Sequence, residues 1–374
     1  MLSRERLNQL IAREPGDAPI FSLFLDVSVN SDNKRTHAVY LAQKRAEYAE
    51  AAGAKNEHRH EQVNRALDRV ERWLAEEFDE SNRGVCIFGE LAGDWFEAIQ
   101  FPVPIVNRFV VDEQPCLGPL LRILNHYHQH GIVLVDREHL RLLSVFMGRT
   151  LHEQEVETEP FPAPHDVQPG GYSAPGYQRR KEEETRHFFK EFAEQVAGFD
   201  RRYAPDDFVV LGTDENVKHF IEVLPVALRE KIVHTAHAPV NGSRQAVLDS
   251  LHPFFEAREA ARNSQAVLTL RDRVQQDHYA TAGLARTLEQ LQEGKVQMLV
   301  VGRDAEARGT RCATCGFYLA GERSTCPYCG GEVRDGIDLI ETMIRLATEQ
   351  EANIEFVEPA AVRDMEGVGA LLRF

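Results

Sequence analysis

Four of the six cysteines lie close together in the sequence and have the spacing of a metal-binding motif. They form two Cys-x-x-Cys pairs separated by ten residues: Cys312, Cys315, Cys326 and Cys329. Each pair makes a tight turn that brings two thiolates to one point, and two such turns complete the tetrahedron that zinc prefers. Gly316 and Gly330 follow directly, where such a turn needs a permissive backbone. We predict a structural zinc ribbon at 312–329, with two reactive dithiols or disulfides as the alternative.

A second feature is the stretch 168–181, QPGGYSAPGYQRRK, which is too rich in glycine and proline to belong to a core. Residues 150–178 contain no lysine or arginine, and three basic residues then follow together: Arg179, Arg180 and Lys181. Long loops without regular structure are usually functional or disordered. We therefore expect either a projecting loop at 168–178, with phosphate contacts at its base, or a flexible linker. The loop residues that we single out are Gln168, Gly170, Gly171, Tyr172, Ser173 and Gln178.

Two other motifs favour simpler interpretations. The three histidines of HYHQH, at 126–130, could share one face of a strand and bind a metal. They continue a helical leucine pattern that we expect to end near Gly131, so we predict that they are scattered over a helix end. GTDEN at 212–216 follows a strand and could bind an anion at a helix start, but an ordinary strand–turn–helix is the preferred interpretation. The sequence has no P-loop, no GxGxxG and no nucleophile-elbow serine.

Composition and charge argue against a membrane protein, a secreted protein and a protein that binds free DNA. Of 374 residues, 43% are hydrophobic and 27% are charged, as in ordinary globular proteins. No apolar run approaches the ~20 residues that span a bilayer, and the first residues, MLSRERLNQL, are too charged for a secretory signal. The net charge is −16, and no third of the chain is basic. We therefore expect a cytoplasmic protein that does not bind free DNA, whereas local basic patches could still contact a folded RNA–protein assembly.

The elements that position these motifs alternate between strand and helix. Apolar runs predict strands at 20–27, 84–90, 131–136, 140–146, 207–213, 231–235, 296–302 and 354–358. Helical spacing of apolar residues predicts helices that include 61–78, 243–262 and 337–350, one around the phenylalanines at 188–199, and one around the leucines at 284–291. We expect three α/β domains, at 1–128, 129–262 and 263–374, with the ribbon inserted in the third. Cys86 and Cys116 are expected to be buried.

Several segments, taken in order, resemble one family. GGYSAPGYQRRKEEETRHFFKEFAEQV resembles the catalytic loop and following helix of the archaeo-eukaryotic class 1 release factors. NRGVCIFGE, GIVLVDRE and PVNGSRQAVLDS resemble their domain junction and middle domain, and EGVGALLRF resembles their third domain. The resemblance covers most of 80–374. It extends to the paralogue Pelota and to bacterial homologues, among them the Balon group of ribosome-hibernation factors.

The resemblance implies a release-factor-like architecture of three domains and a function on the ribosome. It implies binding to ribosomal RNA in the A site, with the 168–178 loop near the peptidyl-transferase centre, and delivery by a translational GTPase of the elongation-factor type. Tyr172 stands where the family has its hydrolytic glutamine, and a phenol of pKa ~10 is a poor base. We therefore predict a non-hydrolytic factor of hibernation or rescue. The alternatives are a peptidyl-tRNA hydrolase or tRNA nuclease, and an adaptor that never meets ribosomes.

The family's stop-codon motif Asn-Ile-Lys-Ser is absent, and the corresponding region reads AGAKNEHRHEQVNRAL. Four polar residues there could contact RNA of the decoding centre: Asn56, His58, Arg59 and His60. Exposed polar residues are common at such positions. We therefore favour the simpler interpretation, a solvated helix start.

Overall fold

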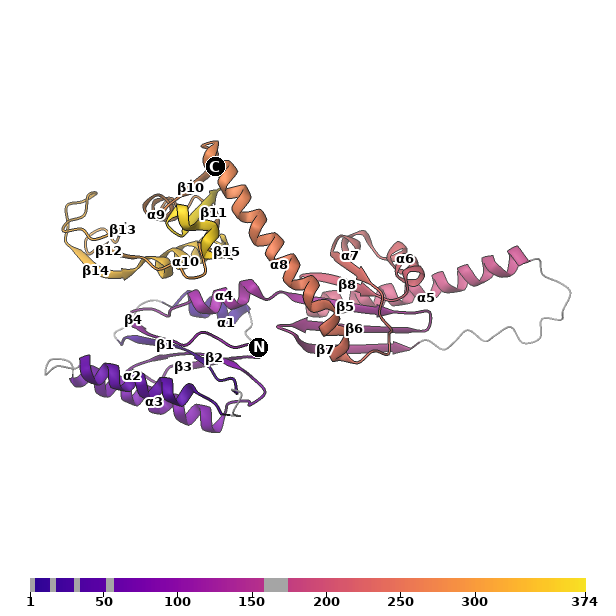
Figure 1. Cartoon of the computed structure of the whole chain (residues 1–374), viewed down its shortest axis with the longest axis horizontal. Helices are drawn as coiled ribbons and strands as arrows, with labels where there is room; N and C mark the ends of the chain where they lie inside the picture. Colours follow the sequence, from indigo (N-terminus) through magenta and orange to yellow (C-terminus); the bar gives the residue numbers. More distant parts are fainter. Residues whose placement is uncertain (1–3, 14–17, 30–33, 52–56, 158–173) are drawn as a thin grey trace. The chain divides into compact units, whose positions relative to one another are not determined.

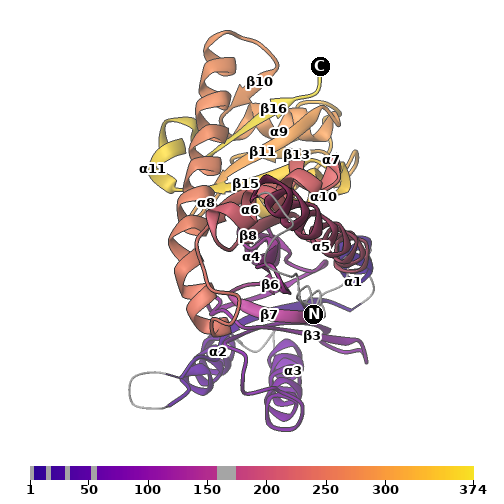
Figure 2. The same cartoon turned by 90° about the vertical axis from the view of Figure 1, so that its right-hand side faces the viewer.

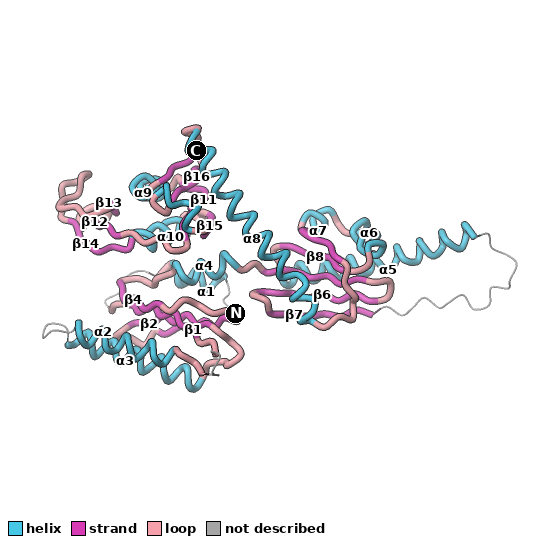
Figure 3. Tube along the Cα trace, viewed as in Figure 1, coloured by secondary structure: helices cyan, strands magenta, loops and turns pink. Residues whose placement is uncertain are grey.

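The computed structural model describes the chain apart from residues 1–3, 14–17, 30–33, 52–56 and 158–173. It divides into two compact units. We call them the terminal unit, which combines Met1–His126 with Arg258–Phe374, and the central unit, Tyr127–Ala257. Figure 3 shows helices and strands in both units. Among the helices that the structure describes, none combines the length and the apolar composition that crossing a lipid bilayer needs.

The N-terminal part of the terminal unit is an antiparallel sheet of order β3-β2-β1-β4. Its strands are β1 (Ile20–Asp26), β2 (Gly84–Glu90), β3 (Phe96–Phe101) and β4 (Arg108–Asp112). Its helices are α1 (Arg4–Ile11), α2 (His37–Ala51), α3 (Glu57–Glu76) and α4 (Gly118–His126). The predicted strands at 20–27 and 84–90 are confirmed, and the helix predicted at 61–78 is α3.

Alternate side chains of β1 point to the two faces of this sheet, and both faces are buried. Phe21, Leu23 and Leu25 belong to one core with residues of α2 and α3, and these two helices run side by side along the sheet (Figures 1 and 2). Because successive side chains of a strand point to opposite faces, Phe24 lies on the other side, where its ring meets Phe88 edge-on at 5.9 Å. The two faces explain why β1 is apolar at nearly every position.

The C-terminal part of the terminal unit is a mixed sheet of order β10-β16-β11-β15, in which β11 and β15 are parallel. Its strands are β10 (Ala280–Ala282), β11 (Val296–Gly302), β15 (Asn353–Val357) and β16 (Val368–Leu372). The helices are α9 (Leu284–Gln292), α10 (Leu339–Glu349), α11 (Pro359–Val362) with the short turn η1 (Arg363–Met365), and the second half of α8 (Arg244–Gln275). One core joins the sheet to α9 and α10, and another joins it to α8 and α11.

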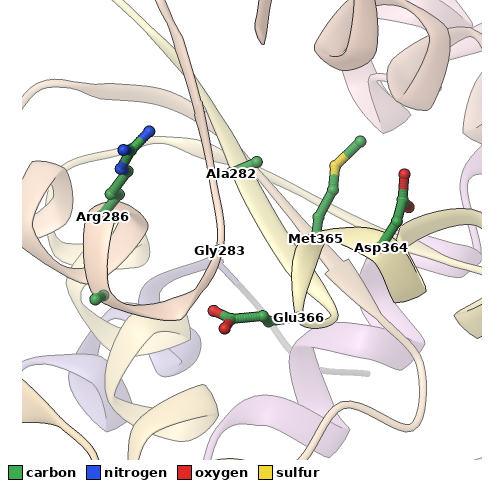
Figure 4. Close-up of a pocket in the computed structure, with 7 residues that line it drawn as sticks. Ala282, Gly283, Arg286, Asp364, Met365 and Glu366 are labelled. Carbon is green, nitrogen blue, oxygen red and sulfur yellow. The ribbon is translucent and has the colours of Figure 1, made fainter.

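The start of α9 is capped from a distant part of the sequence. Gly283 precedes the helix with a φ of +90° and supplies no side-chain cap. Glu366 accepts a hydrogen bond from the Leu284 N–H at 2.8 Å, and it lies in the left-handed region with a φ of 55°. Figure 4 shows this carboxylate facing the first turn of α9. A carboxylate there satisfies a free N–H and complements the helix dipole.

The central unit is built on a five-stranded mixed sheet of order β7-β6-β5-β8-β9. Its strands are β5 (Gln129–Val135), β6 (His139–Phe146), β7 (Arg149–Glu157), β8 (Asp207–Leu211) and β9 (Ile232–Ala236). Its helices are α5 (Ala174–Tyr203), α6 (Asp214–Val223), α7 (Val226–Glu230) and the first half of α8. The predicted hairpin of 131–136 with 140–146 is confirmed as the antiparallel pair β5–β6.

Helices cover both faces of this sheet. Phe189, Phe192 and Phe199 of α5 are buried with residues of α6 and α7 against one face. Val247 and Leu251 of α8 pack on the other. Strands β5 and β8 are therefore apolar at consecutive positions, as expected for strands buried on both faces.

Candidate functional site

The four paired cysteines converge as the sequence predicts. Their sulfur atoms all lie within 4.8 Å of one another. The Sγ atoms of Cys312 and Cys329 are 3.4 Å apart, and those of Cys315 and Cys326 are 3.7 Å apart. A disulfide requires about 2.05 Å, and the cysteines are free. This geometry is that of a four-thiolate ligand set rather than of two disulfides.

Two matching turns present these thiols. The Gly316 N–H bonds to the Cys312 carbonyl at 3.0 Å, and the Gly330 N–H bonds to the Cys326 carbonyl at 2.9 Å. Both glycines have a positive φ, +76° and +74°, which explains why glycine follows each pair. A small sheet supports the turns, made of β12 (Arg308–Cys312), β13 (Tyr318–Ala320) and β14 (Val333–Asp338) in the order β13-β12-β14.

The first turn favours an ionised sulfur at Cys312, whereas neighbouring thiols raise the pKa values of Cys315 and Cys329. The backbone N–H groups of Cys315 and Thr314 both point to Cys312 Sγ at 3.4 Å. Chiefly because of the Cys315 N–H, the pKa of the Cys312 thiol falls to about 6. Thiolates are the form that binds metal, and soft sulfur ligands in a tetrahedral set suit zinc. Four protein ligands leave no open position for a substrate, so such a centre is structural.

The predicted Gly-Gly loop lies largely outside the described residues. This holds for Gln168, Gly170, Gly171, Tyr172 and Ser173. Helix α5 begins at Ala174, so 174–178, which we expected to be loop, is helical, and Gln178 stands in the helix with Arg179, Arg180 and Lys181. Pro175 belongs to the first turn, where proline is tolerated because the N–H has no helical partner there.

Of the proposed decoding residues, Asn56 also lies outside the described residues, and the others begin α3. His58 and Arg59 are exposed, and His60 is partly buried. Both histidines contact the next turn of their own helix: His58 Nε2 is 3.3 Å from Gln62 Nε2, and His60 Nε2 is 2.9 Å from Asn64 Nδ2. These contacts fit a solvated helix start.

The prediction for HYHQH is wrong in its secondary structure. Helix α4 ends at His126, and His130 is in strand β5. The strand begins early because β5 pairs with β6 and β8, which places His130 opposite Asp207. His130 Nδ1 and Asp207 Oδ1 are 2.6 Å apart, and the imidazole stacks on Phe255 at 3.9 Å between ring centroids. Within the described chain, the cysteine cluster is the group placed to hold a metal ion.

GTDEN forms the strand–turn–helix that we favoured. Thr213 caps α6, and its Oγ1 accepts a hydrogen bond from the Asn216 N–H at 3.3 Å. Asp214 and Glu215 occupy the first turn. Their negative charges already complement the helix dipole and would repel a bound anion.

Sequence reasoning missed a polar cluster that joins the two parts of the terminal unit. The Glu341 carboxylate of α10 accepts hydrogen bonds from the backbone N–H groups of Leu117 and Gly118, at the start of α4. It lies 3.4 Å from the Cys116 sulfur. Burial raises the pKa values of both Glu341 and Cys116. No local pattern signals this contact, because an acidic residue in an amphipathic helix ordinarily faces solvent.

The solved structures that the chain matches include archaeal translation factors. An archaeal translation termination factor, aRF1, is 17% identical, with 99% of this chain and 97% of that chain covered and a TM-score of 0.25. A model of ribosome-bound archaeal Pelota with ABCE1 is 12% identical, with 79% of each chain covered and a TM-score of 0.42.

Curated relatives match nearly the whole chain. Peptide chain release factor subunit 1 of Pyrococcus abyssi is 24% identical over 378 residues, which cover 89% of each chain. The same factor of Methanopyrus kandleri is 26% identical over 297 residues, with 74% of this chain and 70% of the relative covered. The chain is therefore similar to archaeo-eukaryotic release factors over most of its length. The particular family model that matches, over residues 115–256, is bacterial archaeo-eukaryotic release factor family 10.

Proposed function

We propose that the protein is a cytoplasmic, ribosome-binding translation factor that occupies the A site without hydrolysing peptidyl-tRNA. The observation that supports this most is the likeness to archaeal peptide chain release factor subunit 1, which extends over 89% of both chains. In this proposal the segment Gly170-Gly171-Tyr172 approaches the peptidyl-transferase centre, and the outcome is ribosome hibernation or rescue. A translational GTPase of the elongation-factor type is the proposed delivery partner.

The non-hydrolytic part of the proposal rests on Tyr172. Peptide release needs a group that places a water molecule against an ester, and the phenol at this position is bulky. Phenols in general have a pKa of ~10 and are almost wholly protonated at neutral pH. An aromatic side chain at the end of a loop is instead suited to stacking on unpaired bases. The phenol therefore favours binding over turnover.

Co-sedimentation with purified 70S ribosomes tests the proposal. The full chain should pellet with empty ribosomes and compete with A-site tRNA for them. A chain that stays in the supernatant at micromolar concentration would instead be an adaptor acting away from the ribosome. Multiple-turnover release of peptide from peptidyl-tRNA would favour the hydrolase alternative.

We also propose that the cysteine cluster holds one structural zinc ion. The support is the convergence of four thiols within 4.8 Å and the free state of each cysteine. Cys312 and Cys326 are buried, whereas Cys315 and Cys329 are exposed. Zinc bound there would link the two turns and would stabilise the small sheet of β12–β14.

The zinc proposal predicts one metal equivalent per chain. Protein purified without chelator should contain one zinc ion per chain when its metal content is measured by inductively coupled plasma mass spectrometry. The Cys326→Ser variant should contain no zinc. The β12–β14 region should then exchange its amide hydrogens faster while the central unit is unchanged, because a structural zinc site contributes directly to local folding. Cys86→Ser, which changes a buried thiol outside the cluster, is the control and should retain the metal. Wild-type protein without zinc would contradict the proposal.

The basic residues near the start of α5 provide a second test. Changing Arg179, Arg180 and Lys181 together to glutamate should weaken ribosome binding at least about tenfold at physiological salt, since phosphate contacts release counterions. The slope of log K against log salt should become shallower by about 2. The matched control changes Arg201 and Arg202, exposed in the last turn of the same helix, to glutamate. Equal affinities for both variants across the salt series would disprove the contact.

A further inference from the structure

A cleft of about 760 Å³ opens in the terminal unit, between its N-terminal and C-terminal parts. It is bordered by β4, the first turns of α4 and α10, and the loop that connects β11 to β12. Its volume falls within the range of small-molecule sites, roughly 300–1,000 Å³. Four arginines line it: Arg108, Arg122, Arg303 and Arg308.

Arg122 is the arginine of this cleft that has neither a hydrogen bond nor an ion pair with the described residues. Its Nε is buried and has no hydrogen bond, and the part of the chain that the structure describes offers the guanidinium no ion pair. The ring of Phe356 lies 5.4 Å away. Burial, followed by the charges of Arg108 and Arg303, lowers the pKa of Arg122. A buried cationic donor that is left unsatisfied is costly, so a missing anion would explain the arrangement.

Protein groups already engage the other three arginines. Arg108 pairs with Asp338 at 3.0 Å. Arg303 pairs with Glu358 at 2.9 Å and with Glu259 at 3.2 Å. Arg308 donates to the Gly336 carbonyl at 3.2 Å. These contacts hold the three arginines in place around the cleft. The guanidinium group of Arg122 is left to bind a ligand.

The carboxylates of the cleft set a limit on the ligand. Glu341 is engaged by the N–H groups at the start of α4, and Asp338 by Arg108. Asp304 and Glu306 are exposed. These carboxylates would repel an anion as it enters. A ligand therefore needs a strongly anionic group that binds Arg122, and the rest of the ligand must be able to lie beside carboxylates. Phe109, Ile340 and Ile344 supply apolar lining for that remainder.

We propose that this cleft binds a phosphate group carried by a ligand of nucleotide size, with Arg122 as the main phosphate contact. The planar guanidinium fork matches phosphate oxygens bidentately. The volume leaves room for a ring system beside the apolar side chains. The phosphate could belong to a free nucleotide or to the backbone of an RNA strand, and the chemistry at Arg122 is the same for both. The proposal does not depend on the proposed ribosomal function.

Calorimetric titration of the full chain tests this proposal with three probes: pyrophosphate, GDP, and a ten-nucleotide single-stranded RNA. At least one probe should bind at submillimolar concentration, and Arg122→Met should weaken that binding at least tenfold. Because Arg122→Met removes a partly buried cation that has no ion-pair partner among the described residues, it should also leave the melting temperature of the free protein unchanged or raise it. Arg271→Met is the matched control, since Arg271 pairs with Asp364 outside the cleft. This variant should bind the probes with the affinity of the wild-type protein.

The probes also separate the two sources of phosphate. Binding of GDP that depends on Arg122 identifies a free nucleotide as the ligand. Binding of RNA that depends on Arg122, without binding of GDP, identifies a strand. Failure of all three probes at millimolar concentration overturns the proposal, and so does binding that Arg122→Met leaves unchanged.

Discussion

Glu341→Ala is expected to destabilise the terminal unit by about 3–5 kcal/mol. The substitution leaves the N–H groups of Leu117 and Gly118 without their acceptor, and Leu117 is only 1% exposed. A buried donor without a partner costs about 1–3 kcal/mol, and this substitution leaves two such donors. The contact joins residues more than two hundred positions apart, so its loss weakens the packing between the two parts of the terminal unit.

Tryptophan fluorescence can isolate this effect. Both tryptophans, Trp73 and Trp95, belong to the terminal unit, so a urea titration followed by their emission reports this unit alone. Glu349→Ala is the matched control, because Glu349 is exposed on the same helix, and it should change stability by less than about 0.5 kcal/mol. Equal midpoints for the two variants would show that the Glu341 contact carries no stability.

The same carboxyl group gives a pH dependence with a definite sign. The pKa of Glu341 is raised above 4.5 by burial, so the folded protein holds this proton more tightly than the unfolded chain does. Its stabilising contribution is complete below pH 4.5 and is lost as pH rises through the raised value. Glu341→Gln cannot titrate. The stability of wild type relative to Glu341→Gln should therefore fall as pH rises from 4 to 8, and a constant difference would contradict the assignment.

Tyr172→Ala should weaken ribosome binding by about 1–3 kcal/mol, or roughly 5- to 150-fold, if the ring stacks on an unpaired base. Tyr172→Phe is the matched control, because it keeps the ring and removes only the hydroxyl, and it should bind nearly as wild type does. Gly171→Ala should also weaken binding, if the turn needs a backbone conformation that a side chain disfavours. Filter binding to purified ribosomes measures all three variants.

Peptide release provides the complementary measurement. The wild-type protein should release no labelled peptide from peptidyl-tRNA in a single-turnover assay, and Tyr172→Gln should gain weak release, because it restores the side chain that the family uses. The opposite pattern, rapid release by wild type that Tyr172→Ala abolishes, would establish the hydrolase alternative.

The long apolar strands were predictable because their burial is visible in sequence. Strand β2 matches its predicted range of 84–90, and β11 matches 296–302. The short strands β4, β10 and β13 were not predicted, since a few residues that pair at a sheet edge or beside the cysteine cluster need no apolar pattern. The helix predicted at 243–262 continues to Gln275, because its second half packs on another sheet.

The two candidate sites also differ in whether the sequence alone could predict them. The cysteine cluster is nearly local, so spacing alone predicted that its sulfurs converge. The cleft around Arg122 combines β4, α4, the β11–β12 loop and α10. Arg122 and Arg303 are brought together only by the packing of the two parts of the terminal unit. Neither residue belongs to a motif, and one sequence without its fold gives no reason to connect them.

The divided terminal unit has a consequence for the order in which the chain can fold during synthesis. The central unit, Tyr127–Ala257, is one continuous segment, and it can fold as soon as that segment has left the exit tunnel, since domains generally fold as units. The N-terminal sheet has all four of its strands by then, but the acceptor for its Leu117 N–H arrives only with Glu341. Until that residue emerges, the surface around the start of α4 stays open. A nascent chain arrested before residue 341 should therefore expose this surface to chaperones while its central unit is already native.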